Sequence, residues 1–206
     1  MFREQCQVLE NKKVAPGHYI LKLFSPRISK AARPGQFVQI VCGDSSGLLL
    51  PRPFSFLTVS KKDFSILYQV VGKGTAILSE KKKGESLWIL GPLGNGFNAH
   101  RKPLTANHGP LILVGGGVGI PPLYYLAEKL TVDRTTSVGS KSKHRPQSVE
   151  AKNIHVFLGA RNKSLLLCEK EFKKLGVILH LATDNGSQGK KGFVTQILDD
   201  FLSSPL

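Results

Sequence analysis

The amino-acid sequence predicts a β + α/β protein in two parts, an antiparallel β-barrel over residues 1–103 and a Rossmann-like parallel α/β domain over residues 108–206. The first part carries short alternating or apolar runs punctuated by Gly and Pro, a pattern typical of an antiparallel barrel or sandwich. The second part alternates apolar strands with helical patterns, which is typical of parallel βαβ units.

In the first part, strands are expected over residues 19–24, 36–41, 54–59, 64–71 and 86–90. Trp88 is placed in the core, as a residue of the last of these strands. One helix interrupts the series over residues 74–83, where apolar Ala76, Ile77 and Leu78 precede a polar end.

In the second part, an apolar strand over residues 111–114 leads into a glycine cluster and then a helix with apolar side chains at helical spacing. Strand 154–158, helix 165–175, strand 177–182 and helix 193–202 follow. We expect His155 and His180, on two of the strands, to be core or edge residues rather than ligands. Residues 131–153 are polar and rich in Ser and Lys, so a mobile surface insert is expected there.

The composition is that of an ordinary globular protein, with 41% hydrophobic and 21% charged residues among 206. No apolar run is long enough to cross a bilayer and no signal peptide is recognised, so a cytoplasmic protein without a membrane span is expected. The three cysteines lie far apart, with no Cys-x-x-Cys pair. This spacing fits a reducing compartment and argues against a metal site.

The net charge of +15 is unusually high, and such a balance can indicate nucleic acid or an anionic membrane as a partner. The basic residues are scattered, however, mostly as doublets beside turns. Aromatic residues that could stack on bases are not interleaved with them. We therefore interpret these residues as solvated surface and expect no nucleic-acid partner.

Two local features are suited to binding phosphate. The glycine cluster of residues 114–122 lies between a strand and a helix, where backbone N–H groups can approach an anion. Ile120 stands where the usual dinucleotide fingerprint has Gly or Ala, so a tight packing turn explains the cluster equally well.

The second feature is Arg52, fixed between two prolines, together with Gly74 and Thr75 at the start of a short helix. Taken alone, that feature is also consistent with a strand edge and a capped helix.

Four motifs occur in one order along the chain, at residues 71–79, 90–97, 115–121 and 183–194. In order and spacing they resemble the ferredoxin–NADP reductase superfamily, and within it the family of dihydroorotate dehydrogenase electron-transfer subunits. The resemblance covers almost the whole chain. Small subunits of related sulfide dehydrogenase and transhydrogenase complexes share much of the pattern.

The resemblance implies a flavoprotein oxidoreductase that exchanges electrons between FAD and the co-substrate NAD(P)H and serves pyrimidine biosynthesis. Its partner would be the catalytic dihydroorotate dehydrogenase subunit or another redox protein. Hydride transfer requires stacked rings and exclusion of water more than proton shuttling, so no acid–base catalytic residue is expected.

The resemblance also implies the site residues. The FAD-binding residues would be Arg52 on the pyrophosphate, Pro53, Phe54, Ser55 near flavin N5, Leu67, Tyr68 and Gln69 along the isoalloxazine and ribityl chain, and Gly74 and Thr75 on the pyrophosphate. The residues that receive NAD(P)H would be Gly115, Gly116, Gly117, Gly119 and Pro121, with Thr183 and Asp184 in a loop at the far side of the nucleotide.

The sequence departs from the family pattern in its C-terminal part. The family normally continues with further parallel strands and a cysteine cluster that binds a [2Fe–2S] centre, whereas Cys6, Cys42 and Cys168 have no ligand spacing. A C-terminally shortened α/β domain without a metal is therefore expected. Three explanations stay open: a fragment, a lineage in which another protein supplies the next carrier, and a non-catalytic paralogue that acts as a flavin-binding or regulatory subunit. The choice between NADH and NADPH is open too, since Arg161 could tolerate a 2′-phosphate.

Overall fold

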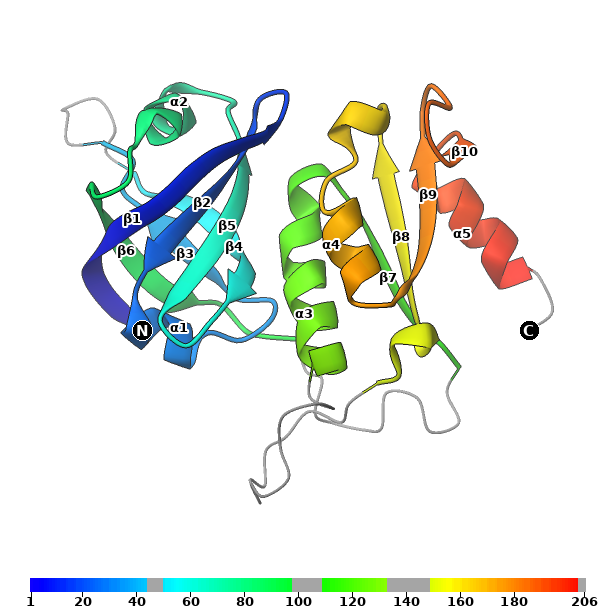
Figure 1. Ribbon diagram of the computed structural model, residues 1–206, viewed down its shortest axis with the longest axis horizontal. Helices are drawn as coiled ribbons and strands as arrows, with labels where there is room; N and C mark the ends of the chain where they lie inside the picture. The colour runs from blue at the N-terminus through cyan, green and yellow to red at the C-terminus, as the bar shows by residue number, and fades with distance from the viewer. Residues whose placement is uncertain (44–49, 98–108, 133–148, 204–206) are drawn as a thin grey trace, which may run out of the picture. The chain divides into compact units, whose positions relative to one another are not determined.

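The computed structural model describes residues 1–43, 50–97, 109–132 and 149–203. The chain divides into two compact units, Met1–Phe97 and Asn98–Leu206 (Figure 1). The predicted boundary between residues 103 and 108 lies outside the described residues, and the assignment of a cofactor to each part stays a prediction.

The first unit is a closed antiparallel barrel. Its strands are β1 (Phe2–Ala15), β2 (His18–Phe24), β3 (Phe37–Ile40), β4 (Arg52–Val59), β5 (Asp63–Gln69) and β6 (Ser86–Leu93). They follow one another around the barrel in the order β1-β2-β5-β4-β3-β6, and every neighbouring pair is antiparallel. Two helices accompany them, α1 (Pro26–Ala31) and α2 (Lys73–Glu80). The predicted barrel is therefore confirmed.

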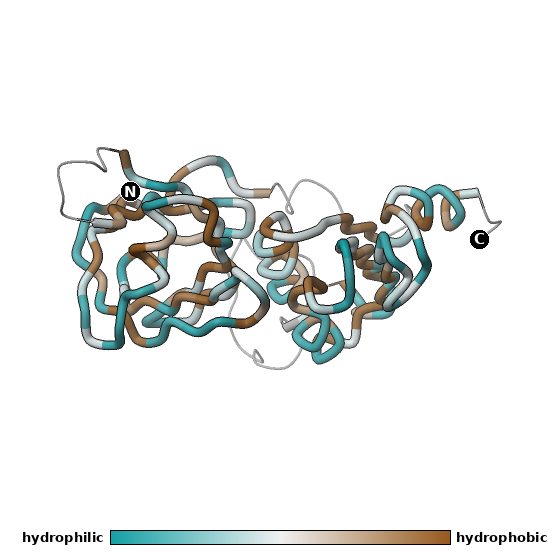
Figure 2. The backbone as a smooth tube through the Cα atoms, turned by 90° about the horizontal axis from the view of Figure 1, so that it is seen from above, coloured by the Kyte–Doolittle hydropathy of each residue, from teal (hydrophilic) through white to brown (hydrophobic). Residues whose placement is uncertain are grey.

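Alternation along the strands builds the barrel core. Side chains at every second position point inward, because successive residues of a strand face opposite sides of the sheet. Apolar and polar segments accordingly alternate along the tube of this unit in Figure 2. The fully buried side chains of the barrel include Val8, Leu21, Leu23, Val38, Ile40, Phe56, Phe64 and Ile66.

Strand β1 and helix α1 are absent from the sequence-based assignment. In β1 only a short stretch around Cys6 and Val8 is buried, while most other positions are polar or charged, so the alternation is weak in the sequence. Nevertheless β1 pairs with both β2 and β6 and thereby closes the barrel. Helix α1 is one short turn whose start is set by Ser25, the hydroxyl of which accepts the Ile28 N–H at 3.2 Å.

The prediction that Trp88 is a core residue is wrong. The Trp88 side chain is 41% exposed, and its strand neighbours Leu87 and Ile89 fill the core instead. The Arg3 guanidinium carbon lies 5.2 Å from the centre of the indole ring, a cation–π contact on the outer face of the barrel. The register of the strand, rather than the hydrophobicity of a residue, decides which face of the sheet its side chain occupies.

The second unit is a parallel sheet covered by helices. Strands β7 (Leu111–Gly116), β8 (Ile154–Ala160), β9 (Ile178–Thr183) and β10 (Lys190–Lys191) lie in the order β10-β9-β8-β7 and are all parallel. Helices α3 (Ile120–Val132) and α4 (Glu169–Lys174) lie on one side of the sheet and α5 (Val194–Ser203) on the other (Figure 1). The predicted βαβ alternation is thus confirmed. No helix in the described part of the chain is long and apolar enough to span a membrane.

Two boundaries in this unit differ from the sequence-based expectation. The helix expected over residues 165–175 begins only at Glu169, because Cys168 has a φ of 58°, which an α-helix does not tolerate. A separate short turn, η3 (Lys163–Leu165), precedes it. The insert expected over residues 131–153 is shorter at both ends, since α3 runs to Val132 and η2 spans Ala151–Asn153. Val149 and Glu150 are described as well, and residues 133–148 lie outside the described residues.

His155 and His180 form a pair between the sheet and α5. The Nδ1 atom of His155 lies 3.1 Å from Nε2 of His180, and the rings are stacked. Phe157 stacks on His180 at 4.2 Å between ring centres, while Phe201 of α5 contacts both imidazoles at 4.8 and 5.4 Å. Both histidines are thus structural residues of the sheet face, as the sequence predicts.

We expect this pair to make the stability of the second unit depend on pH. Burial lowers the pKa of both His155 and His180 below 6.5, and the neighbouring His155 lowers that of His180 further. The folded state therefore binds fewer protons than the unfolded state, so the free energy of unfolding falls as the pH drops through and below about 6.5. We expect the unfolding temperature followed by circular dichroism to fall between pH 7.5 and 5.5, with a smaller fall in His180→Phe. The fluorescence of Trp88, the one tryptophan of the chain, follows unfolding of the barrel unit and serves as the internal reference for the second unit. Equal pH slopes in the two proteins would rule out this origin.

Candidate functional site

The residues predicted to hold FAD meet where β4 and β5 separate. The ladder between the two strands begins at Phe56 and Ile66, so Arg52–Ser55 and Leu67–Gln69 lie beyond its end. On their other sides both segments remain paired, with β3 and with β2 respectively. The main-chain edges that face each other here have no ladder partner among the described residues. Two sequence motifs, 12 or more positions apart in the chain, are thus brought together.

Arg52 lies beside the N-terminus of α2. A Cβ atom built on Gly74 would lie 3.6 Å from Nε of Arg52 and 3.7 Å from Cβ of Cys42, so the three residues are neighbours. Arg52 is held by a hydrogen bond from Nη1 to the Leu50 carbonyl oxygen at 2.8 Å. The first N–H groups of a helix have no partner within it and carry a partial positive charge, so Arg52 places a cation beside N–H groups of a kind that suits an anion.

The Thr75 side chain stabilises the start of α2 by hydrogen bonds to the backbone that precedes the helix. Its hydroxyl oxygen accepts the N–H groups of Val71 and Gly72 at 2.9 and 3.2 Å and donates to the Gly72 carbonyl at 3.0 Å. Because the hydroxyl is occupied in this way and the residue is buried, only the backbone N–H of Thr75 is suited to a phosphate. Gly74 and Thr75 therefore fit the predicted pyrophosphate site through their main chain.

The predicted flavin-lining segment of β5 is mostly covered. Leu67 and Tyr68 are 3% and 1% exposed, whereas Gln69 is exposed. Tyr68 stacks on Tyr19 at 5.6 Å and meets Phe54 edge to face at 5.8 Å. Burial raises the pKa of the Tyr68 phenol well above its usual value. Leu67 and Tyr68 are therefore covered by other residues, and Gln69 is the member of this segment with an exposed side chain.

The remaining residues of the β4 motif do not all share one face. Alternation places Arg52 and Phe54 on one face of β4 and Pro53 and Ser55 on the other. Pro53 is exposed, and Phe54 and Ser55 are half-buried. The role of Ser55 near flavin N5 stays a prediction.

Cys42 is a member of this site that the sequence does not reveal. It is 4% exposed and contacts the position of Gly74 beside Arg52. Burial raises the pKa of its thiol, an effect that the Arg52 charge partly offsets. An isolated cysteine at the end of a predicted strand carries no sequence signal, because its neighbours at the site come from other segments.

The glycine cluster of the second unit combines packing with open backbone. A Cβ on Gly116 would lie 2.7 Å from the Gly159 carbonyl oxygen, so Gly116 is required for close packing of the two backbones. A Cβ on Gly115 would lie 2.6 Å from Leu123 Cδ1, the end of a side chain that can move aside. Gly117 has a φ of 54°, and nothing lies within 4 Å of the Cβ positions of Gly117 and Gly119. Packing therefore explains Gly116, and binding of a phosphate at Gly117 and Gly119, where the backbone is open, stays a prediction.

Pro121 contributes to this edge differently from the prediction for it. It lies in the first turn of α3, where a missing N–H costs nothing, and it is buried. Any contact between Pro121 and a nucleotide would therefore be limited to atoms at the surface of the turn.

The loop after β9 joins the glycine cluster at the carboxyl edge of the sheet, where open α/β folds bind ligands. Thr183 is fully buried, its hydroxyl donating to the Gln188 carbonyl at 2.7 Å and accepting the Gln188 N–H at 3.1 Å. Asp184 is exposed, and its N–H donates to the carbonyl of Ala160 at the end of β8 at 3.1 Å. The Thr183 side chain thus stabilises the loop by hydrogen bonds, whereas the Asp184 side chain is exposed at the surface. Arg161, the position considered for a 2′-phosphate, follows β8 and is exposed.

The cysteines do not fit an iron–sulfur cluster. Cys6 and Cys42 are buried in the barrel unit, and Cys168 belongs to the other unit. Burial raises the pKa of Cys6 and of Cys168 to about 12, which disfavours the thiolate that a metal requires. Among the residues that the structure describes, no three His, Cys, Asp or Glu side chains converge as metal ligands.

Comparison with known proteins identifies the family. No family profile matches the chain. The chain is 35% identical over 199 residues to the dihydroorotate dehydrogenase B (NAD(+)) electron transfer subunit of Geobacillus kaustophilus, which covers 96% of this chain and 69% of the relative. The chain belongs to the family of dihydroorotate dehydrogenase B electron transfer subunits. The subunit from Desulforamulus reducens is 35% identical over 195 residues, covering 94% of this chain and 66% of the relative.

Solved structures agree with this family. The NADH-dependent reduced ferredoxin-NADP oxidoreductase, described for flavin-based electron bifurcation, aligns with a TM-score of 0.74 at 32% identity, covering 97% of this chain and 64% of that chain. A flavohemoglobin from Malassezia yamatoensis with bound FAD and heme aligns with a TM-score of 0.71 at 19% identity, over 93% of this chain and 49% of that one, which shows the fold alone. The chain thus spans about two thirds of the length of its family relatives. The predicted two-domain fold and the prediction of an electron-transfer subunit of an oxidoreductase are confirmed at the level of the family.

Proposed function

We propose that this member of the dihydroorotate dehydrogenase B electron transfer subunits holds FAD in its barrel unit and receives NAD(P)H at its α/β unit. The observation that carries the proposal is the separation of two strand ends, Arg52–Ser55 of β4 and Leu67–Gln69 of β5. Arg52, at the first of these ends, lies beside the start of α2. A cation, the first N–H groups of a helix and strand edges without a ladder partner among the described residues suit a ligand that combines a pyrophosphate with a flat, hydrogen-bonding ring.

Each unit has a defined task in this proposal. Arg52 and the backbone of Gly74 and Thr75 neutralise and orient the pyrophosphate. The open backbone at Gly117 and Gly119 lets a nicotinamide nucleotide approach the carboxyl edge of the parallel sheet. When bound, FAD supplies a carrier that accepts a hydride from NAD(P)H and releases the two electrons one at a time. No side chain needs to act as an acid or base for the hydride step.

The proposed electron acceptor is the catalytic dihydroorotate dehydrogenase subunit, in keeping with the family. A second candidate is another redox protein, as in a transhydrogenase-type complex, which the 32% identity to the ferredoxin-NADP oxidoreductase favours. Dihydroorotate-dependent reduction of NAD⁺ by a mixture of this chain, loaded with FAD, and the catalytic subunit would support the first candidate. If that mixture does not reduce NAD⁺, and the chain instead transfers electrons between NADPH and ferredoxin, the second candidate is supported.

Absorbance spectroscopy tests the cofactor directly. The purified chain, incubated with FAD and separated from excess, is expected to retain the flavin absorbance band and to lose it on anaerobic addition of NADH or NADPH. Titrating the two nucleotides separately measures the preference between them. Protein that does not retain FAD, or FAD that neither nucleotide reduces, would contradict the proposal.

A further inference from the structure

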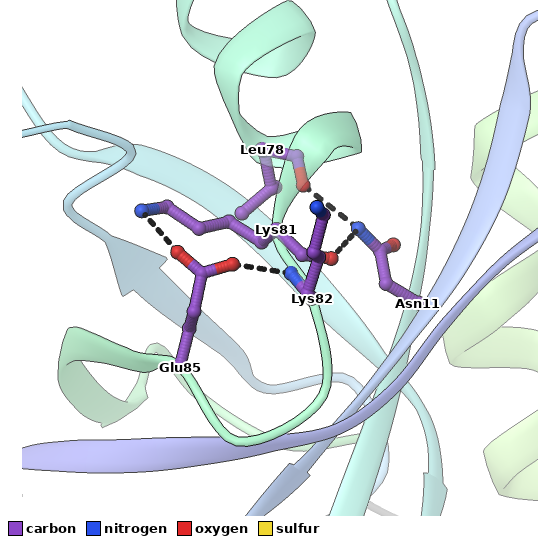
Figure 3. A network of polar contacts seen from close by, with 5 residues as sticks. All are labelled: Asn11, Leu78, Lys81, Lys82 and Glu85. Atoms are coloured by element: carbon purple, nitrogen blue, oxygen red, sulfur yellow. Dashed lines mark hydrogen bonds and ion pairs between the residues drawn. The ribbon is translucent and has the colours of Figure 1, made fainter.

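Asn11, in the middle of β1, connects three segments of the barrel unit that are distant in sequence. Its Nδ2 atom donates to the carbonyl oxygens of Leu78 and Lys81 at 2.8 and 3.0 Å (Figure 3). The Tyr68 hydroxyl donates to its Oδ1 atom at 3.0 Å. Both donors and the acceptor of the amide are thus directed at groups that lie 57 to 70 residues away.

Through the first two bonds, Asn11 anchors the C-terminal end of α2. The last carbonyls of a helix have no partner within the helix, and Lys81 is the residue that caps α2. The Leu78 carbonyl already accepts the Lys81 N–H at 3.2 Å, so the Asn11 amide adds a second donor to it and also donates to the Lys81 carbonyl. Because α2 has 8 residues and is rigid, holding its C-terminal end also restricts where its N-terminal end lies. That N-terminal end, with Gly74 beside Arg52, is the proposed pyrophosphate site.

Through the third bond, Asn11 holds the other side of the site. Tyr68 is buried between Tyr19 and Phe54, and it directly precedes Gln69 at the separated end of β5. The Asn11 amide is a hydrogen-bonded link between this strand end and α2. Its side chain is half-buried, so loss of the link would leave carbonyl groups and a phenol without these partners.

We propose that Asn11 is a positioning residue of the FAD site, which keeps the phosphate-binding start of α2 in register with the ring-binding end of β5. The proposal rests on the assignment of FAD to the barrel unit. A purely structural cap would affect only the stability of the barrel. A positioning residue also affects the affinity of the folded protein for FAD.

Two substitutions separate these roles. Asn11→Ala removes both donors without introducing a charge, and we expect it to weaken FAD binding by about tenfold, which corresponds to the loss of about one net hydrogen bond. Asn11→Asp is nearly isosteric and keeps the acceptor for Tyr68, but it turns an oxygen toward two carbonyls. Protonation of that carboxyl restores one donor, so FAD affinity of Asn11→Asp is expected to recover as the pH is lowered from 8 to about 5.5.

The neighbouring turn supplies a matched control. The Glu85 side chain forms an ion pair with Lys81 at 3.1 Å and accepts the Lys82 N–H at the same end of α2 (Figure 3). Glu85 contacts β1 through its backbone carbonyl, which accepts the Val8 N–H at 2.8 Å and is unchanged by substitution of the side chain. Glu85→Gln is expected to bind FAD within about twofold of the unsubstituted chain. Tyr68→Phe removes only the third bond and is expected to give a smaller loss than Asn11→Ala.

The experiment measures FAD dissociation constants of the full chain by equilibrium dialysis, alongside circular dichroism and thermal unfolding of the apoprotein. A folded Asn11→Ala or Asn11→Asp that binds FAD as tightly as the unsubstituted chain would overturn the inference, as would a loss in Glu85→Gln of the same size. If Asn11→Ala does not fold, the pH recovery of Asn11→Asp and a loss of FAD affinity in folded Tyr68→Phe that exceeds the loss in Glu85→Gln decide the matter. An unsubstituted chain that does not bind FAD would instead refute the proposed function.

Discussion

Arg52→Gln is expected to lower the affinity of the chain for FAD by about 10- to 100-fold, equivalent to about 1.4–2.8 kcal/mol. The guanidinium lies beside the start of α2, where it adds a full positive charge to the helix N–H groups. Glutamine keeps much of the packing volume but carries neither the charge nor the planar fork that matches two phosphate oxygens. Fluorescence titration of the apoprotein with FAD measures the change.

Two further variants make this result specific. Arg52→Lys keeps the charge but loses the fork, so an intermediate affinity is expected. Arg27→Gln is the control for charge alone: Arg27 lies in the same unit, 65% exposed, 3.7 Å from Glu4 and 4.6 Å from the Phe2 ring, away from the assigned FAD residues. The assignment of Arg52 would be untenable if Arg27→Gln and Arg52→Gln bound FAD equally well.

Alanine substitutions in the glycine cluster are expected to give opposite phenotypes at two positions three residues apart. In Gly116→Ala the new methyl group would meet the Gly159 carbonyl oxygen at 2.7 Å, a contact between two backbones that only a shift of β7 against β8 can relieve. Overpacking of this kind costs about 1–3 kcal/mol, or a decrease of about 3–10 °C in the unfolding temperature of the α/β unit. Calorimetry or circular dichroism measures that decrease.

In Gly119→Ala the new methyl group points into open space, so the unfolding temperature is expected to change by less than about 1 °C. The same methyl group would cover backbone that the proposal offers to a nucleotide. We therefore expect the NADH concentration for half-maximal flavin reduction to rise about tenfold. An unchanged NADH dependence of flavin reduction in Gly119→Ala would contradict the proposal that the nucleotide binds at this turn. An unchanged unfolding temperature of Gly116→Ala would contradict the packing role of Gly116.

The sequence predicted those elements whose signal is local. Strands β2 to β6 have alternation bounded by Gly or Pro, and β7 to β9 are apolar runs followed by helical periodicity. The polar strand β1 lacks such a signal, and α1 is too short to show periodicity. Trp88 shows the complementary error, since hydrophobicity alone does not say which face of a strand a side chain occupies.

For the candidate site, the resemblance to the family predicted the segments, and the structure shows which residues within them are exposed and which are buried. Tyr68 and Thr183 belong to the predicted set, yet both are buried and engaged with the protein, whereas Arg52, Gln69 and Asp184 remain accessible. Sequence position cannot separate these two groups, because the side chain that covers a residue comes from another strand.

The two-part architecture, the family and most of the elements, β1 and α1 excepted, are predictable from the sequence, because strand periodicity, turn residues and ordered motifs are encoded over short distances. The folded chain alone shows that β4 and β5 separate beside α2, that Gly116 is a packing residue while Gly119 is open, and that Asn11 links three distant segments. Each of these depends on the register and proximity of strands far apart in the chain, and no local pattern of residues specifies that proximity.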